Sequence, residues 1–563
     1  MLTRIVERLD EATVLLALAA CGLLVMEASG QYPDQAEVLR AANLCILTLF
    51  GVNVAWDQAV AKHRLAHLRR HWFAWLVFAP LVQFSTRIEG GTGSIVLSQI
   101  AIGAMIVSRL RRTNRFVFLL SFKPAFLMLV SFAAAILAGT VLLMLPAASA
   151  SAVHTSLIDA LFTATSAVCV TGLTVQDTAT HFSIFGQCVI LALIQAGGLG
   201  IMTFSVAIVL LMRRTVGVSQ GATMRAVLDQ ESAANIRQTI LFIFGMTFAT
   251  ELLGTAALAL TWWGRFPPAD TFYHAAFHSI SAFCNAGFST WSGNLVQFSG
   301  DWVTCGIIAG LIVVGGLGFV VIHDLSEHAR RRLTTGHRWA RPYHAQTQIA
   351  LRMTLALILG GALVIGGMEW SGAFAGRPPG ERALLALFQS ITTRTAGFNT
   401  IDIAALGPAS LLVMMALMFI GACPGSTGGG IKTTTLAVVL AAARRGLQRR
   451  NEVEMCRRTV PGETIQKAIA VVVLSSAAVF AVGLALLATE RLPFEKVLFE
   501  TISAFGTVGL SAGITGSLTV GGKAWIALLM LIGRLGPLTV AFAFLRPGKT
   551  VNYRHAEESI MIG

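Results

Sequence analysis

Four short stretches of this chain each place a glycine before a bulky apolar residue, and they recur a little over a hundred residues apart. Glycine enters backbone conformations with positive φ without a Cβ clash. Carbonyl oxygens aimed at one axis replace the hydration shell of a potassium ion. We therefore predict four filter loops that coordinate K⁺ through the backbone. Their residues are Cys169, Val170, Thr171, Gly172 and Leu173; Cys284, Asn285, Ala286, Gly287 and Phe288; Arg394, Thr395, Ala396, Gly397 and Phe398; and Gly506, Thr507, Val508, Gly509 and Leu510.

An amphiphilic run precedes each stretch, and apolar segments of roughly 20 residues, long enough to cross a bilayer, flank it. The repeated unit is thus membrane helix, short helix, glycine loop, membrane helix. A loop at membrane depth must be sheltered from lipid, and four loops around one wet axis meet that need. A glycine after a helix is also an ordinary C-cap, but four at matching places favour a shared pathway. The predicted short helices are Leu157–Val168, Thr271–Phe283, Arg382–Thr393 and Phe494–Phe505.

The segments after the four stretches contain distinctive glycine-rich strings. They are Gln195–Thr203, Gly315–Phe319, Gly421–Thr433 and Gly533–Thr539. With these strings, the chain resembles the bacterial Trk/Ktr potassium-uptake proteins over about Phe122–Leu545.

The resemblance implies an all-α polytopic membrane protein with four helix–pore-loop–helix repeats and pseudo-four-fold symmetry. It implies K⁺ as the substrate, no enzymatic activity, no cofactor, a homodimer, and regulation by a separate cytosolic ring protein that binds nucleotide. Relatives with serine in place of the first filter glycine are sodium-dependent, whereas this chain has Gly172. Coupling to Na⁺ or H⁺, and the choice between channel and symporter, stay open.

The repeats divide the chain into six parts. We expect an N-terminal accessory module of about four helices, four pore repeats, and a cytoplasmic tail. Their bounds are 1–121, 122–235, 236–345, 346–463, 464–545 and 546–563. The N-terminal module is similar in size to a voltage sensor, but its arginines, from Arg109 to Arg115, cluster at one end of the last apolar run. Gating charges recur through a membrane helix, so an accessory module is favoured.

The third repeat departs from the others in two respects. Its filter contains Arg394, which we expect to point back into the protein, since the ion contacts only backbone carbonyls. Its inner helix is interrupted by proline and five glycines, which remove helical hydrogen bonds and helix propensity. The resemblance implies a movable gating loop beneath the filter. A nucleotide P-loop is excluded because Ile431 separates the glycines from Lys432. The predicted gate comprises Gly421, Ala422, Cys423, Pro424, Gly425, Ser426, Thr427, Gly428, Gly429, Gly430 and Lys432, together with Arg534.

Arg534 lies in an apolar segment of the fourth inner helix. A charge at such depth marks a functional site, and we predict that it faces the pore as a cationic barrier. The alternative is a structural ion pair with Glu251 or Glu500.

The composition places the protein in a membrane. Hydrophobic residues make up 55% of the chain and charged residues 12%, and the mean hydropathy is +0.71. The net charge of +14 does not indicate nucleic-acid binding, because basic and basic-poor connections alternate as in a multi-pass protein. This pattern predicts a multi-pass membrane protein with both termini cytoplasmic, and the resemblance implies the bacterial inner membrane. Anionic lipid or an acidic partner suits the basic loops.

Other groups admit a metal interpretation. Cys169 and Cys284 occupy equivalent filter positions, and His274 and His278 lie four residues apart on one helical face. We interpret them as buried structural residues, since a third ligand is not evident. Glu251 lies within an apolar segment with no partner evident from the sequence. Two rival functions are an alternating-access carrier, which would show two inverted halves, and a membrane enzyme using these histidines and Glu251.

Overall fold

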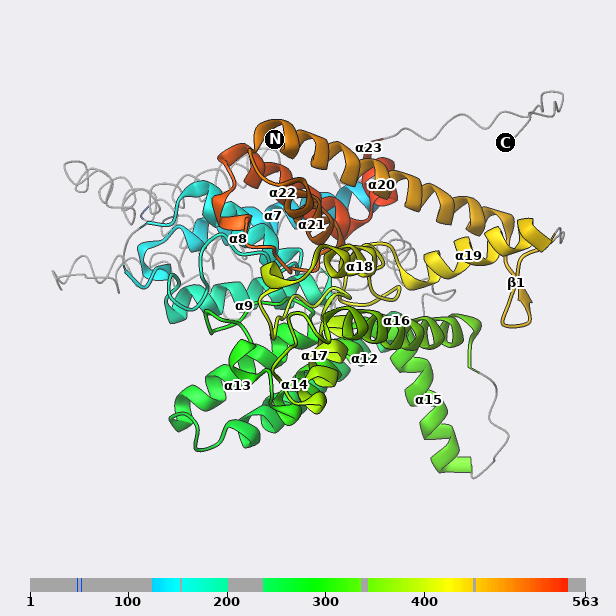
Figure 1. Cartoon of the computed structure of the whole chain (residues 1–563), viewed down its shortest axis with the longest axis horizontal. Helices are drawn as coiled ribbons and strands as arrows, with labels where there is room; N and C mark the ends of the chain where they lie inside the picture. Colours follow the sequence, from blue (N-terminus) through cyan, green and yellow to red (C-terminus); the bar gives the residue numbers. More distant parts are fainter. Residues whose placement is uncertain are drawn as a thin grey trace.

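A computed structural model describes residues 48, 52, 124–151, 154–200, 236–335, 343–448 and 452–544. Apart from two single residues, the predicted N-terminal module lies outside the described residues, and so do the C-terminal tail and the last three residues of the first glycine-rich string. The described part is mostly helical (Figure 1).

The helices follow the predicted order of long helix, short helix, loop and inner helix. The first unit contains α7 (Pro124–Leu143), η3 (Pro146–Ala148), α8 (Leu157–Val168) and α9 (Ile184–Leu199). The second contains α12 (Ile236–Trp262), α13 (Pro268–Phe283), η5 (Val296–Phe298), α14 (Trp302–Leu317) and α15 (Phe319–Thr335). The third contains α16 (Ala345–Glu369), α17 (Pro379–Thr392), η6 (Ile403–Ala405), α18 (Pro408–Phe419) and α19 (Thr433–Gln448). The fourth contains α20 (Gly462–Thr489), α21 (Phe494–Gly506), η7 (Thr515–Ser517), α22 (Val520–Leu535) and α23 (Pro537–Phe544).

A two-stranded hairpin precedes the fourth unit. Strand β1 (Glu454–Met455) pairs antiparallel with β2 (Arg458–Thr459), and Glu454 lies opposite Thr459. In Figure 1 the hairpin lies beyond the end of α19, and α15 extends away from the helical body.

Local sequence determines where the short helices begin. The Ser156 hydroxyl caps α8 by accepting a hydrogen bond from the Asp159 N–H at 3.2 Å. Proline occupies the first position of α13 and α17, where its missing N–H costs nothing and its fixed φ suits the helix. These two helices therefore begin at Pro268 and Pro379, three residues before the predicted starts.

Long apolar helices identify an integral membrane protein. Within the described ranges, α12, α16 and α20 are long and apolar enough to cross a bilayer, and two bent helix pairs pass the same test when each is taken as one span. All three long helices are the first helix of their unit. Their outward faces expose large apolar residues such as Leu253, Leu363 and Phe480, as expected for contact with lipid.

The packing of the units forms a closed cycle. Each inner helix contacts the short helix of the following unit: α9 packs on α13, α14 on α17, α18 on α21, and α22 returns to α8. Such a cycle gives the four glycine loops one common centre.

The inner helices correct one expectation, that only the third would be interrupted. Helix α14 ends before Gly318 and turns by 99° into α15, and α22 ends before Gly536 and turns by 95° into α23. The first inner helix, α9, ends at the corresponding Gly200. These glycines have φ of +89°, +84° and +74°, a conformation that other residues seldom adopt.

Candidate ion pathway

All four glycine loops share one pattern of positive φ. The second and fourth residues of every loop have positive φ. The second residues include Val170 and Thr395, with φ of +56° and +73°, and β-branched residues pay a steric cost there. Such strain persists only where the surroundings impose it, and it gathers at functional sites. The remaining values are +60° for Asn285, +50° for Thr507, +93° for Gly172, +70° for Gly287, +75° for Gly397 and +90° for Gly509.

The four glycines touch the next loop in a closed ring. A Cβ at Gly287 would lie 2.8 Å from the Ala396 carbonyl oxygen, closer than real Cβ contacts allow. A Cβ at Gly172, Gly397 or Gly509 would overlap the equivalent carbonyl oxygen of the next loop. Those oxygens belong to Ala286, Val508 and Thr171, respectively. Glycine is therefore required at these positions for space as well as for φ.

Hydrogen bonds hold the loops against their short helices. The third residue of each loop donates its N–H to a carbonyl of the preceding helix, as from Thr171 to Ser166 at 2.7 Å and from Val508 to Ser503 at 2.9 Å. Helix hydroxyls also bind the loops. The Ser281 hydroxyl donates to the Phe288 carbonyl at 2.8 Å, and the Thr392 hydroxyl donates to the Phe398 carbonyl at 2.6 Å. Because these N–H groups face the helices, they do not occupy the centre of the ring.

A polar cavity of about 280 Å³ opens on one side of the ring. All four loop glycines line it, together with Gln176, Asp177, Ser289, Asn399 and Ser511. A hydrated cation would find oxygen groups and a carboxylate there before reaching the loops.

The broken segment of the third unit lies against the loops. Between α18 and α19 the chain is non-helical, with Ile420 paired to Ile431. The Gly429 N–H donates to the Thr507 hydroxyl at 3.0 Å, and the Thr427 hydroxyl donates to the Phe283 carbonyl at 3.3 Å. The Cys423 N–H donates to the Gly316 carbonyl at 3.0 Å. The segment is thus attached to the second and fourth units.

Arg534 extends from α22 to this segment. Its guanidinium donates to the carbonyls of Thr427 and Gly197. The two acids proposed as ion-pair partners are engaged elsewhere: Glu251 accepts from Gln195 Nε2 at 3.1 Å, and Glu500 accepts from the Thr515 hydroxyl. Arg534 therefore connects the first, third and fourth units through backbone oxygens.

Comparisons with known proteins agree with this architecture. Residues 97–553 match the TrkH family model, described as a cation transport protein. This chain belongs to the TrkH family. It is 39% identical over 439 residues to Ktr system potassium uptake protein B of Vibrio alginolyticus, covering 78% of this chain and 94% of that protein. It is 37% identical over 444 residues to the protein of the same name from Bacillus subtilis, covering 78% of this chain and 97% of that protein.

A solved structure supports the fold. The potassium transporter TrkH from Vibrio parahaemolyticus superposes with a TM-score of 0.64 at 18% identity, covering 86% of this chain and 97% of that one. Members of the TrkH family are transport proteins and not enzymes, which confirms that prediction from the sequence.

In this TrkH-family protein, Arg394 points away from the ring. Its side chain is buried and donates to the Thr354 hydroxyl of α16 at 3.4 Å and to the Thr354 carbonyl at 3.5 Å. Lys432 also turns to backbone oxygen, since its Nζ lies 2.6 Å from the Gly428 carbonyl. Both cations brace loops through carbonyl and hydroxyl groups.

The cysteine and histidine residues have structural contacts. Cys169 and Cys284 are buried free thiols at the ends of α8 and α13. His278 lies 2.9 Å from the Ser289 hydroxyl, and His274 lies 2.7 Å from the Thr290 hydroxyl. Among the described residues, no group of three or more His, Cys, Asp or Glu side chains could hold a metal ion.

Sequence reasoning missed a polar cluster behind the second loop. Besides its bond to Glu251, Gln195 lies 3.6 Å from the Cys284 sulfur through its side-chain oxygen. The three residues come from α9, α12 and the end of α13, so no local pattern joins them. Gln195 in the glycine-rich string and the isolated acid Glu251 were the only available signals.

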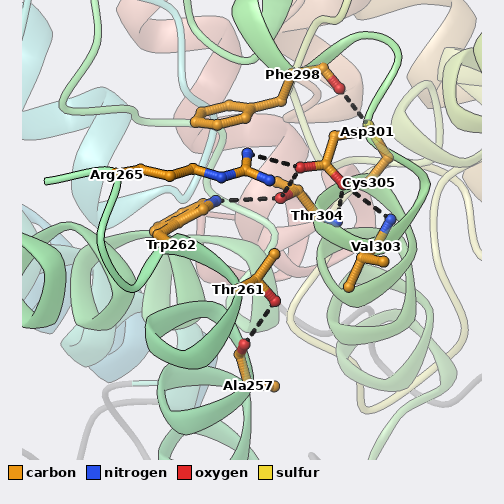
Figure 2. Close-up of polar contacts among 9 residues, drawn as sticks. All are labelled: Ala257, Thr261, Trp262, Arg265, Phe298, Asp301, Val303, Thr304 and Cys305. Atoms are coloured by element: carbon orange, nitrogen blue, oxygen red, sulfur yellow. Dashed lines mark hydrogen bonds and ion pairs between the residues drawn. The ribbon is translucent and has the colours of Figure 1, made fainter.

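Figure 2 shows the polar contacts that join the end of α12 to the start of α14 in the second unit. Asp301 caps α14 by accepting from the N–H groups of Val303 and Thr304 at 3.1 and 3.2 Å, and it pairs with Arg265 at 2.9 Å. Trp262 Nε1 donates to the Thr304 hydroxyl at 3.1 Å. Burial acts to raise the pKa of Asp301, but the hydrogen bonds from Thr304 and Arg265 outweigh it and hold that pKa below its ordinary value.

Proposed function

We propose that this protein carries K⁺ selectively across the bacterial inner membrane, through a pore formed by four pseudo-four-fold-related pore repeats. The observation that carries the proposal is the closed ring of Gly172, Gly287, Gly397 and Gly509, each beside a carbonyl oxygen of the next loop. Carbonyl dipoles gathered around one axis favour a dehydrated K⁺ ion. The potassium-uptake names of the relatives support the choice of ion.

The segment from Gly421 to Gly430 serves as the gate. It has hydrogen bonds with the second and fourth units, and it contains glycines that permit rearrangement of the backbone. Arg534 adds a positive charge beside this segment and binds the Thr427 carbonyl. Opening requires that this bond break and that the cation move away from the path.

The cyclic order of the units argues against two inverted halves. Contacts run from each inner helix to the next short helix around the whole cycle. An alternating-access carrier built from inverted repeats would instead pair the units across a two-fold axis. We retain the repeat boundaries near residues 122, 236, 346 and 464 as part of the proposal.

The remaining parts of the proposal rest on family membership and charge. The basic connections face the cytoplasm, with both termini on that side. A homodimer and a separate nucleotide-binding ring protein complete the regulated system. Either passive permeation or coupling to Na⁺ or H⁺ is compatible with this pathway.

The test of selectivity is Gly172→Ser in reconstituted vesicles, with rubidium uptake measured against competing sodium. A side chain at Gly172 would collide with the Ala286 carbonyl and displace it. We expect sodium to compete more strongly than in the parent. Gly306→Ser is the matched control, because a Cβ there would meet no atom of the described chain within 4 Å. Unchanged ion preference in a normally folded Gly172→Ser protein would show that the ring is not the filter.

A further inference from the structure

Two adjoining cavities are lined by α15, α16, α19 and the hairpin, and neither is lined by a filter-loop residue. One, of about 890 Å³, is lined mainly by charged and polar groups, including Arg352, Arg457, Arg458 and His328. The other, of about 480 Å³, has an apolar wall that includes Ile349, Met353, Leu440 and Val453, and it is also lined by charged residues such as Arg444, Arg445 and Glu454. Arg352 and Cys456 line both cavities. A polar chamber and a chamber with one apolar wall, called the apolar chamber below, thus meet at Arg352.

The position of Arg352 relates these cavities to the membrane surface. Arg352 is seven residues after the start of α16 at Ala345, which is about 10 Å along the axis. A helix of 25 residues is about 37 Å long, somewhat longer than the hydrocarbon core of about 30 Å. With the helix centred in the bilayer, the Arg352 Cα lies about 7 Å inside the hydrocarbon boundary on the basic side. An exposed guanidinium there extends toward the headgroups.

Charge in the two cavities favours an anion. Six arginines line them against four acids. Three of the acids are engaged within the protein. Asp324 accepts from the His344 N–H at 3.1 Å, and Glu327 pairs with Arg331 at 2.5 Å. Glu452 accepts from the Thr459 hydroxyl at 3.1 Å. The resulting balance is positive at the level where lipid phosphates lie.

The turn between β1 and β2 has a strained backbone, and it places Arg457 and Arg458 where the two cavities meet. Cys456 and Arg457 have φ of +50° and +60°, although neither is glycine or asparagine, which such turns prefer. Arg352 Nη1 lies 3.9 Å from the Cys456 sulfur. Backbone strain of this kind persists where the surroundings impose it. Arg457 and Arg458 are thereby kept beside Arg352.

The apolar chamber is accessible to lipid. Leu440 on its wall is 54% exposed, and Leu447 further along α19 is 87% exposed. Large apolar side chains exposed at a membrane surface are suited to acyl chains and not to water. An amphiphile with a phosphate beside Arg352 would place its chain along Ile349, Met353 and Leu440.

We propose that these cavities bind one anionic glycerophospholipid from the leaflet that faces the basic loops. Its phosphate lies between Arg352 and the hairpin arginines, and an acyl chain fills the apolar chamber beside α19. This site goes beyond the proposed transport function and is independent of the filter. The lipid would join α16, α19 and the hairpin into one unit at the base of the third repeat.

The test is native mass spectrometry of the full-length protein in micelles containing equal amounts of phosphatidylglycerol and phosphatidylcholine. The parent protein is expected to retain one phosphatidylglycerol molecule in preference to phosphatidylcholine. Arg352→Gln should weaken its apparent affinity about fivefold, since a basic residue near an anionic leaflet contributes on the order of 1 kcal/mol. Arg352→Lys should retain most of the binding. Arg332→Gln is the charge-matched control on α15, outside both cavities, and should bind as the parent does.

A second variant separates a lipid from a simple anion. Ala441→Trp fills the apolar chamber but leaves every arginine in place, and it should also lose the bound phosphatidylglycerol. Excess inorganic phosphate should not displace the lipid. The proposal is overturned if Ala441→Trp retains the lipid, if phosphate displaces it, or if Arg332→Gln loses it to the same extent as Arg352→Gln. It is also overturned if Arg352→Gln reduces capture of an acidic protein partner while lipid binding is unchanged. Size-exclusion profiles confirm that each variant is folded.

Discussion

Replacing Arg534 by alanine is expected to increase K⁺ flux through the proposed pore while leaving ion preference unchanged. The guanidinium has two effects. It holds the broken segment through the Thr427 carbonyl and the end of α9 through the Gly197 carbonyl. In the proposed pore it also places a positive charge on the path below the ring, so alanine would remove both the bonds and the charge.

The electrostatic effect is large enough to measure. Two unit charges 5 Å apart at an effective dielectric constant of 20 repel each other by about 3 kcal/mol. If this barrier limits permeation, its removal speeds flux by roughly a hundredfold. A hydrogen bond to a charged group contributes about 1.5–3 kcal/mol. Losing each of the two guanidinium bonds would therefore destabilise the present position of the broken segment and favour its movement.

The assay is rubidium flux into vesicles containing the purified protein without any partner. Arg534→Lys is the informative companion, because it keeps the charge but lacks the planar guanidinium fork that binds two carbonyls at once. Flux near the parent's in the lysine variant would assign the barrier to charge, whereas flux near the alanine variant's would assign it to the two carbonyl bonds.

One result would refute the reasoning about Arg534. It is a folded Arg534→Ala protein that conducts no faster than the parent. If both variants fail to fold and removal of Glu251 or Glu500 rescues them, Arg534 is a structural ion-pair partner, contrary to the contacts described above. Arg491→Ala, at an exposed arginine before α21, controls for the loss of one positive charge.

Three further predictions concern the gate and the connections between units. Deleting Gly425–Gly429 should raise basal rubidium flux in partner-free vesicles, because in the proposed pore this segment obstructs the path; a folded deletion variant with parental flux would contradict this. Lys523 and Asp159 pair at 2.7 Å, each side chain being 12% exposed, and they join α22 to α8 where the cycle closes. Lys523→Ala should lower the melting temperature in detergent, by an amount corresponding to about 3 kcal/mol, and adding Asp159→Asn should restore part of the loss; no change in either variant would rule out this role. Because the folded pKa of Asp301 lies below its ordinary value of 3.8, the stabilisation from its ionised form is present above that value and is lost as the pH falls through the folded pKa. Melting curves should therefore show a drop in stability at acidic pH that Asp301→Asn lacks, and identical pH profiles for the two proteins would contradict the assignment.

Several features of this protein follow from its sequence alone. Spacing of the glycine stretches and of the apolar segments predicted the repeated unit, because hydrophobic length and backbone conformation are local properties. Predicted ranges for α8 and α21 agree with the structure to within one residue. The broken segment between α18 and α19 was also predictable, since proline and five glycines in ten residues disfavour any continuous helix. The direction of the Arg394 side chain, away from the ring and into the protein, was expected because a K⁺ ion in such a filter contacts only backbone carbonyls.

Tertiary structure decided which groups meet. Cyclic packing that returns α22 to α8 cannot be deduced from periodicity, because a buried face does not specify its partner. Arg534 binds the carbonyls of Gly197 and Thr427, and a backbone acceptor leaves no side-chain signature in the sequence. The contact of Gln195 with Glu251 joins positions 56 residues apart. The bends after α14 and α22 were also not predictable from the sequence. A glycine permits positive φ, but only the packing around Gly318 and Gly536 determines that the helix turns there.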